Sequence, residues 1–400
     1  MLSKTIVYAI CAANLIVLPA MAEVYSTRNF GMGGAGVASS QYSDAPGSNG
    51  ALLTRFGETD DVALNIPQLA VQASDKENVL DTLDDIPDLY DDLKSNIDSG
   101  NTPGALNNAE NIIQKLEEIS GDVVGDVAAA LIGFAKPSKS LAIAFDVRSS
   151  LQAAVVVDYV STDRAVLLRA IATGDIGVLD KTESSALGLG ALVTEAVLTV
   201  AREFAIDDDN AVSLSISPKY QRVDTLIYAA TVQDYDDNDL DENRNDDGNF
   251  NVDVGVSYAL DEDWMFGLSG RNLISEDYDT KNLALGSESF QGTYQIKPAA
   301  VLGVAYGVES FTATLEGDLL KNRTFKGFDK TQFLRAGAEY SALGWIQLRV
   351  GYRYDIEDNY ENIFTAGLGV SPWDVFHFDL SGSYGENDTY GLALGFLWTF

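Results

Sequence analysis

His377 is the only histidine of the 400-residue chain, and strand alternation would place it on one face with Asp379 and Ser381. These three residue types form the catalytic triad of serine hydrolases, so the pattern raises the hypothesis of a barrel lipase or a protease. A working triad needs the nucleophile, the base and the orienting acid to converge from different elements, which three neighbours on one strand cannot easily do. A polar strand face turned into a lumen is favoured instead, and we predict that the protein has no catalytic residues.

The acidic segment 234–247 raises a weaker hypothesis of a metal site. Residues 243–248 resemble the start of a calcium-binding loop, but the twelfth position of such a loop would be Val254 rather than a bidentate glutamate. This excludes an EF-hand, and a solvated charge run is favoured over a looser divalent-ion site. The carboxylates that such a site would use are Asp234, Asp236, Asp237, Asp239, Asp241 and Asp247.

Four glycines near the N-terminus form a third pattern. Gly31, Gly33 and Gly36 satisfy the dinucleotide-binding fingerprint G-x-G-x-x-G, with Gly34 beside them. That fingerprint binds a pyrophosphate only where a buried strand feeds a helix, and no such strand precedes it here. We predict no cofactor, and we expect the glycines to let an N-terminal hatch, residues 23–56, fold tightly within or beneath a barrel.

Composition narrows the class of protein. Lys4, an apolar stretch and Ala20-Met-Ala22 predict a signal peptide over residues 1–22, and the only cysteine, Cys11, lies inside it. The mature chain would therefore lack disulfides, zinc-thiolate sites and cysteine nucleophiles. The 60 acidic and 26 basic residues would repel phosphate backbones, so no direct contact with nucleic acid is expected. No later segment approaches the roughly 18 apolar residues of a membrane helix, so entry into a membrane would require a closed barrel.

The last eleven residues carry the strongest structural signal. Large apolar side chains occupy the even positions from Leu392 to Phe400, and mostly small or polar ones alternate with them, Leu397 being the exception. On a strand this pattern predicts one face toward lipid and one toward a lumen. Alternation of this kind recurs from about residue 141 onward.

The connections between these segments alternate between short turns and long loops, as in outer-membrane barrels. We predict an all-β fold, a transmembrane antiparallel barrel of about 14 strands formed by residues 57–73 and 138–400, with an acidic helical insert at 74–137. One ambiguity remains open, because residues 140–160 fit either one long strand or a hairpin bent at Ser149. In the second case segment 62–73 would lie outside the wall.

The insert shows apolar residues at spacings of three and four, which predicts two amphipathic helices separated by a break at residues 99–104. Pro87 would kink the first helix. The helices could form a lid over the barrel mouth or a docking surface for a partner. A lid is favoured, because helical apolar stripes usually pack against their own chain.

Charged residues on three successive predicted strands would face the lumen with signs that can pair. This predicted lumen charge ladder comprises Glu316, Asp318, Arg335, Glu339, Arg349 and Arg353. Segments 153–157 and 165–168 are apolar on both faces, so we expect the N-terminal segment or a ligand to cover them from inside.

Several segments resemble a known family. The glycine-rich start, Arg28-Asn-Phe-Gly-Met-Gly-Gly-Ala-Gly-Val-Ala38, resembles the hatch of FadL-like outer-membrane barrels. Two further segments resemble the conjugal-transfer TraF-type barrels of that superfamily. They are Leu334-Arg-Ala-Gly-Ala-Glu-Tyr340 and Leu348-Arg-Val-Gly-Tyr352. Residues 48–53 depart from the superfamily, because many FadL-like chains have Asn-Pro-Ala-x-Leu there. The end of the chain resembles the C-terminal signal read by the barrel assembly machinery, through Gly395, Trp398 and Phe400.

The resemblance implies a protein of the Gram-negative outer membrane whose partners are lipid and the assembly machinery. The leading hypothesis is a non-enzymatic role in plasmid transfer, type IV secretion or envelope transport, with conjugation or secretion components as partners. The alternative is a FadL-like channel for hydrophobic small molecules. The barrel lipase that would use His377 stands third.

Overall fold

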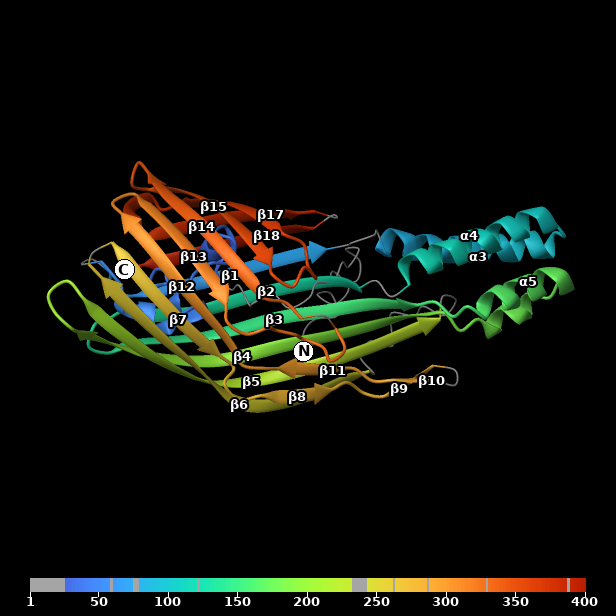
Figure 1. Ribbon diagram of the computed structural model, residues 1–400, viewed down its shortest axis with the longest axis horizontal. Helices are drawn as coiled ribbons and strands as arrows, with labels where there is room; N and C mark the ends of the chain where they lie inside the picture. The colour runs from blue at the N-terminus through green and yellow to red at the C-terminus, as the bar shows by residue number, and fades with distance from the viewer. Residues whose placement is uncertain are drawn as a thin grey trace.

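Figure 1 shows the computed structural model, which describes residues 26–57, 60–74, 79–120, 123–231, 243–261, 263–285, 288–328, 330–386 and 389–400. Fourteen strands of these residues close into one antiparallel barrel, in which each strand pairs with its neighbours in sequence and β1 closes against β18. The predicted fold class is therefore confirmed. The strands are β1 (Ala63–Ser74), β2 (Val123–Lys136), β3 (Ala142–Asp158), β4 (Ser185–Ala205), β5 (Ala211–Thr231), β6 (Arg244–Leu260), β7 (Trp264–Arg271), β12 (Ala299–Val308), β13 (Phe311–Asp318), β14 (Phe333–Ala342), β15 (Ile346–Asp355), β16 (Ile363–Val370), β17 (Phe376–Gly385) and β18 (Tyr390–Thr399).

A continuous apolar band surrounds the barrel, because every one of these strands exposes at least one large apolar side chain on its outer face. All four tryptophans lie exposed at the end of the barrel where the short turns are: Trp264, Trp345, Trp373 and Trp398. An apolar band edged by aromatic residues is the surface that a barrel presents to lipid. Leu397, the exception in the alternation of β18, faces inward and is buried against Tyr42 and Leu52 of the N-terminal segment.

The wall is much taller on one side than on the other. β4 and β5 have 21 residues each, whereas a strand needs only about 10 to cross a bilayer. β3 is a single strand of 17 residues, which settles the ambiguity at Ser149 and makes β1 a strand of the wall. The surplus length forms an extension of the sheet beyond the apolar band, at the end where the long loops lie.

Three helices lie at the tip of this extension: α3 (Val79–Asp98), α4 (Thr102–Ile119) and α5 (Asp163–Thr173). α3 packs against α4 and α4 against α5, and the group lies at the opposite end of the long axis from the C-terminus (Figure 1). The helices project away from the barrel, so the expected lid over the mouth is not what the structure shows. None of the helices that the structure describes is long and apolar enough to cross a membrane.

Two predictions from the sequence are wrong, one about the end of the insert and one about segment 165–168. The insert does not extend to residue 137, because β2 pairs with β1 and β3 as part of the wall. The alanines of β2 hide its alternation, although Ile132 and Phe134 point outward and Leu131 inward. Segment 165–168 belongs to α5, which ends at Gly174 in a left-handed conformation, and therefore has no strand faces to cover.

The N-terminal segment forms a hatch inside the barrel, as predicted for the fold. It contains α2 (Thr27–Phe30), η1 (Ala45–Gly47) and η2 (Gly50–Thr54), and nearly all residues from 26 to 54 are buried. Asn29 N–H donates to Ser26 Oγ to cap α2, and Asn49 Oδ1 accepts from Ala51 to begin η2. The predicted signal peptide lies outside the described residues.

Candidate functional site

The hatch lies directly on a glycine patch of the wall. Gly337 and Gly351 face each other across β14 and β15, and a Cβ at Gly337 would lie 2.7 Å from Met32 O. A Cβ at Gly351 would overlap the Gly33 nitrogen. Gly33 has φ 73°, a left-handed conformation that favours glycine, and its N–H donates to Thr365 Oγ1 at 2.9 Å. The backbone of the hatch therefore touches the backbone of the wall, and no space remains between them here.

Charged side chains fix the same contact. Arg28 of the hatch donates from Nε and Nη2 to the two carboxylate oxygens of Glu339, both at 2.9 Å. Glu339 also accepts from Arg349 Nε at 2.6 Å, and Arg349 pairs with Asp379. A bidentate arginine–carboxylate pair is strong and directional, and all four side chains are shielded from water. This network ties the hatch to three strands of the wall.

The other members of the lumen charge ladder also face inward and are buried. Arg335 pairs with Asp318 at 2.6 Å, and Glu316 accepts from the backbone N–H of Ala38 in the hatch at 3.0 Å. Arg353 donates to Gln72 Oε1 at 3.1 Å, and its guanidinium lies 5.0 Å from the centre of the Phe333 ring. The six residues thus divide between contacts to the hatch and contacts within the wall.

Sequence reasoning missed a second buried charge cluster on the opposite wall. Lys219 lies 2.9 Å from Glu195 and 3.0 Å from Asp253, while Arg148 pairs with Asp146. Each of these residues alternates with outward-facing apolar residues on β3 to β6, so the same signal that revealed the first ladder was available for this one. The lumen is therefore lined by charge on both sides of the hatch.

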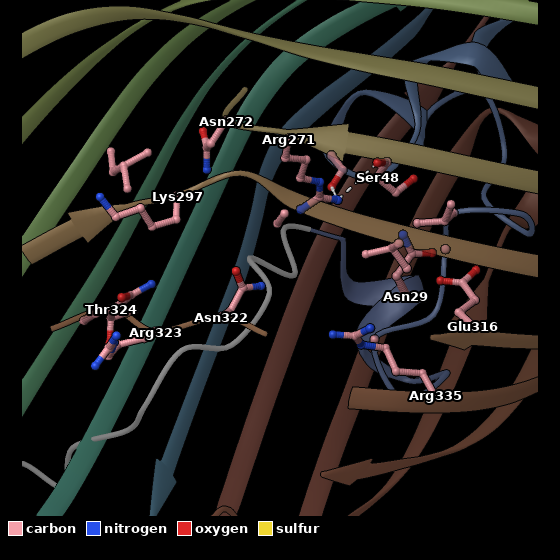
Figure 2. A pocket seen from close by; sticks show the side chains of 18 of the residues that line it. Asn29, Ser48, Arg271, Asn272, Lys297, Glu316, Asn322, Arg323, Thr324 and Arg335 are labelled. Atoms are coloured by element: carbon pink, nitrogen blue, oxygen red, sulfur yellow. Dashed lines mark hydrogen bonds between the residues drawn. The ribbon is translucent and has the colours of Figure 1, made fainter. Parts of the chain in front are cut away.

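A cavity of about 100 Å³ lies on the hatch, on the side of the long loops. Figure 2 shows Lys297 and Arg323 at one end of the cavity and Glu316 and Arg335 at the other end. Arg271 lies between these two ends. Arg271 Nη2 donates to the carbonyl oxygens of Gly47 and Ser48 in the hatch at 2.8 and 3.1 Å. The remaining polar lining includes Asn29, Gln152, Asn272, Gln295, Asn322 and Thr324.

The loop between β13 and β14 folds inward to close one wall of this cavity. Phe325 is buried, with its ring centre 5.3 Å from that of Tyr294 on β11 (Thr293–Ile296). Gln295 N–H donates to Thr324 O at 2.6 Å, and Lys326 N–H donates to Thr293 O at 2.9 Å. These contacts place Arg323 and Thr324 at the cavity.

Lys297 reaches the cavity from the segment after β11. Its ammonium pairs with Asp277 on β8 (Glu276–Asp279), outside the apolar band. The hydrogen bond from Lys297 holds the pKa of the Asp277 carboxyl below its usual value. The carboxylate therefore stays ionised at neutral pH.

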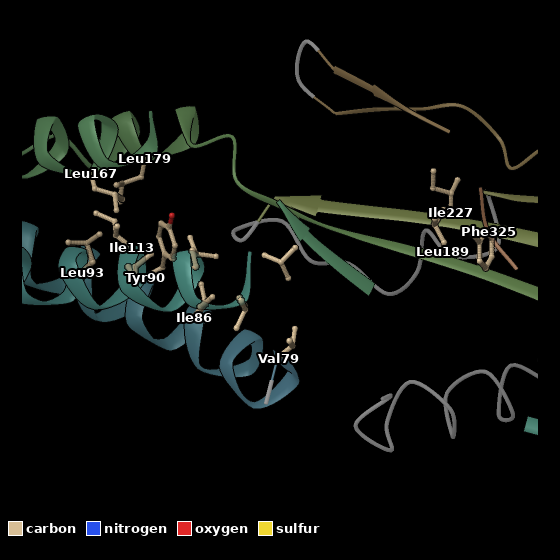
Figure 3. Packing of buried hydrophobic residues seen from close by; sticks show 14 of the residues in the cluster. Val79, Ile86, Tyr90, Leu93, Ile113, Leu167, Leu179, Leu189, Ile227 and Phe325 are labelled. Carbon is tan, nitrogen blue, oxygen red and sulfur yellow. The ribbon is translucent and has the colours of Figure 1, made fainter. Parts of the chain in front are cut away.

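Apolar side chains form the core of the extension above the cavity. Leu189, Ile227 and Phe325 lie at one end of this outer apolar cluster, and the helical residues Ile86, Leu93 and Ile113 lie at the other (Figure 3). Burial raises the pKa of the Tyr90 hydroxyl in α3 to about 12, so this residue is neutral at physiological pH. The mouth of the barrel is thus apolar, whereas the lumen below it is charged.

The structure separates the three residues of the hypothetical triad. His377 Nε2 lies 2.8 Å from Thr399 Oγ1, Asp379 pairs with Arg349, and Ser381 Oγ donates to Thr27 O. Each is engaged with a different partner, and no nucleophile–base pair forms among them.

Of the acidic candidates for a divalent ion, Asp234 to Asp241 lie outside the described residues, and Asp247 accepts from Gly248 N–H. Trp398 and Phe400 of the C-terminal signal are exposed, and Gly395 lies against Gln68 and Thr27.

Comparison with known proteins identifies both a family and a fold. A family model described as "F plasmid transfer operon, TraF, protein" matches residues 47–318. The chain is 11% identical to the toluene transporter TbuX of Ralstonia pickettii, with a TM-score of 0.56 over 94% of this chain and 99% of that one. The deltaS2S3 mutant of the monoaromatic hydrocarbon channel TodX is 10% identical, with a TM-score of 0.59 over 94% of this chain and 99% of that one. The Pseudomonas putida toluene transporter TodX is 9% identical, with a TM-score of 0.52 over 96% of this chain and 98% of that one. No curated protein matches. At these identities the solved structures show a shared fold alone.

Proposed function

Because the chain belongs to the family of the F plasmid transfer operon TraF protein, and because it folds as a FadL-like barrel, we propose that it is a non-enzymatic outer-membrane channel for small organic molecules. The outer membrane of a Gram-negative bacterium is the proposed location. The apolar band and the aromatic C-terminus support it, with lipid and the barrel assembly machinery as partners.

One arrangement carries this proposal. An apolar mouth leads to a cavity that rests on a plugged lumen. An apolar molecule that arrives from outside would enter the outer apolar cluster and stop on the hatch, whose backbone touches the wall directly at the glycine patch. Passage would therefore require the hatch to shift. The titles of the similar solved structures name toluene and monoaromatic hydrocarbons as cargo of those proteins, which agrees with such an entry route.

A reversible lock on the hatch tests the proposal. A Cβ at Gly31 would lie 3.4 Å from Ser381 Cβ, close to the separation of bridged cysteines. The double variant Gly31→Cys/Ser381→Cys should form a disulfide, and the predicted mature chain has no other thiol. Toluene crosses a plain phospholipid bilayer unaided, so the vesicles need a lipopolysaccharide outer leaflet, which slows apolar solutes. We expect such proteoliposomes with wild-type protein to take up labelled toluene faster than protein-free vesicles of the same composition. The oxidised variant should lose this uptake and regain it on reduction.

The Ser381→Cys single variant under the same oxidant is the matched control. Uptake of toluene by wild-type protein no faster than by protein-free vesicles would contradict a channel for hydrocarbons. Unchanged uptake by the oxidised double variant would contradict passage past the hatch.

A role in plasmid transfer is the second candidate, and a different observation favours it. α3 and α4 together carry ten acidic and two basic residues and project from the barrel at the loop side. Lys94 and Lys115 are both engaged, with Asp91 and Asp85. Such a charged projection suits contact with conjugation or secretion components. Deletion of the gene from a conjugative element should then lower transfer frequency without altering toluene uptake. Unchanged transfer would exclude this candidate.

A further inference from the structure

The charge of the cavity is opposite to that of the chain. The protein has 60 acidic and 26 basic residues, yet the cavity lining contains four basic side chains, Arg271, Lys297, Arg323 and Arg335, and one acidic side chain, Glu316. A cavity of this composition attracts negative charge through a protein that otherwise repels it. The contrast indicates selection of the ligand by charge at this point.

Among the four cations, Arg323 stands apart. Arg335 is held by Asp318 through two contacts, and Lys297 is paired with Asp277. Within the part of the chain that the structure describes, Arg323 forms no ion pair, although it is half-buried at the cavity. A guanidinium removed in part from water and left without an anion gains strongly from a ligand carboxylate.

A neutral acceptor lies in the same lining. Gln152 of β3 is 4% exposed, and its Oε1 has no hydrogen-bond partner among the described residues. A buried amide oxygen without a partner is costly, and a ligand hydroxyl or amine would satisfy it. The cavity thus offers a cation and an acceptor together.

The lining also contains apolar side chains. Tyr294 and Ile296 are buried in the outer apolar cluster and also border the cavity, with Val37 and Val301 nearby in the lining. A compact apolar body could rest on these side chains while its polar groups reach Arg323 and Gln152. The small volume of the cavity favours a single ring over a long chain.

We infer that the cavity on the hatch binds a compact organic carboxylate that carries a second, hydrogen-bond-donating group, as a hydroxylated aromatic acid does. This inference rests on the proposed channel function and names its ligand class. The class differs from the hydrocarbons named for the similar structures. A hydrocarbon would cover Arg323 without supplying an anion and would leave Gln152 Oε1 without a hydrogen bond.

Three probes that share one ring test the ligand class: toluene, benzoate and 4-hydroxybenzoate. Binding to the purified full chain in detergent is measured by calorimetry, and uptake is measured in proteoliposomes. We expect 4-hydroxybenzoate to bind about two- to tenfold more tightly than benzoate, as a neutral hydrogen bond provides. Benzoate should bind at least tenfold more tightly than toluene.

Two variants test the contributions of Arg323 and Gln152 separately. Arg323→Gln should weaken binding of both carboxylates by about ten- to a hundredfold, without changing that of toluene. Gln152→Leu should remove the preference for 4-hydroxybenzoate over benzoate. Arg169→Gln, on the exposed face of α5 outside the cavity, is the matched charge control and should change neither.

The outcomes distinguish this inference from the proposed function. Transport of toluene with no binding of either carboxylate would overturn the inference and leave the channel intact. Absence of uptake of all three probes would overturn the channel itself. Carboxylate binding that is unaffected by Arg323→Gln would overturn the assignment of the site.

Discussion

Arg28 and Glu339 join the hatch to the barrel wall through two parallel hydrogen bonds of 2.9 Å, although 311 residues separate them in the sequence. Both are buried, and Glu339 is shared with Arg349. The pair therefore connects the charge network of the wall directly to the hatch.

Removing the charge of Glu339 should release the hatch. Glu339→Gln leaves Arg28 and Arg349 facing each other without the carboxylate between them, and breaking one partner of a buried pair costs about 3–5 kcal/mol. We expect faster proteolysis of the hatch and a lower unfolding temperature in detergent. Arg164→Ala is the control, because its pair with Glu110 is exposed and should contribute less than about 1 kcal/mol. Equal effects of the two variants would contradict the role of Glu339.

The glycine patch leads to a steric prediction. A Cβ at Gly351 would overlap the backbone of Met32 and Gly33, which cannot move away as a flexible side chain can. Gly351→Ala should therefore displace the hatch and raise ion conductance across planar bilayers. Gly382→Ala on the outer face of β17 is the matched control, because its nearest neighbour would be 3.7 Å away. Wild-type conductance in Gly351→Ala would show that the hatch does not depend on this contact.

The helical tip should unfold independently of the barrel. Leu93 is fully buried in the outer apolar cluster, and truncation of a buried leucine to alanine costs about 2–5 kcal/mol. Leu93→Ala should increase hydrogen exchange in α3 and α4 while exchange in β14 to β18 stays unchanged. Leu106→Ala provides the comparison, because Leu106 is 43% exposed. Protection of α3 equal to that of the wild type would argue against a packed helical unit.

The pair between Lys297 and Asp277 gives a prediction that depends on pH. Because the hydrogen bond from Lys297 lowers the pKa of Asp277, the pair contributes above the ordinary aspartate pKa and is lost as the pH falls through the lowered value. Lys297→Met should raise the pKa of Asp277 back toward its usual value. Carbon-detected NMR titration of the carboxyl would measure this shift. A pKa that does not rise would contradict the role of Lys297 and would leave the hydrogen bond from Gln295 and the charge of Lys326 as the causes of the lowered value.

Sequence patterns predicted the parts of this molecule that repeat. Alternation in β18 indicated a lipid face and a lumen face, and the single exception, Leu397, proved to be packed on the hatch. Alternation did not predict β2 as a strand, because its alanines give almost no contrast in polarity between the two faces. A periodic signal requires side chains that differ in polarity, and the alanines of 128–130 do not provide that difference.

The cavity could not be predicted in the same way. Its lining combines the hatch, one residue of β3, the end of β7 and the segment that follows it, β12, β13, the loop before β14 and β14 itself, so its residues are distant in sequence. Only closure of the barrel brings Gln152 to the same cavity as Arg323. The buried cluster around Lys219 was accessible to alternation, whereas the fit between Gly33 and Gly351 depends on backbone geometry that no residue pattern reveals.

The height of β4 and β5 has a consequence for the living cell. Each strand has 21 residues, of which about 10 cross the bilayer, so the remainder extends roughly 35 Å along the tilted strand beyond the lipid before the helices begin. The proposed outer-membrane location, with the long loops outside the cell, therefore predicts that antibodies and bacteriophages reach the bend at Ser99 and Gly100 on intact bacteria. A peptide epitope inserted there should be stained without permeabilising the envelope.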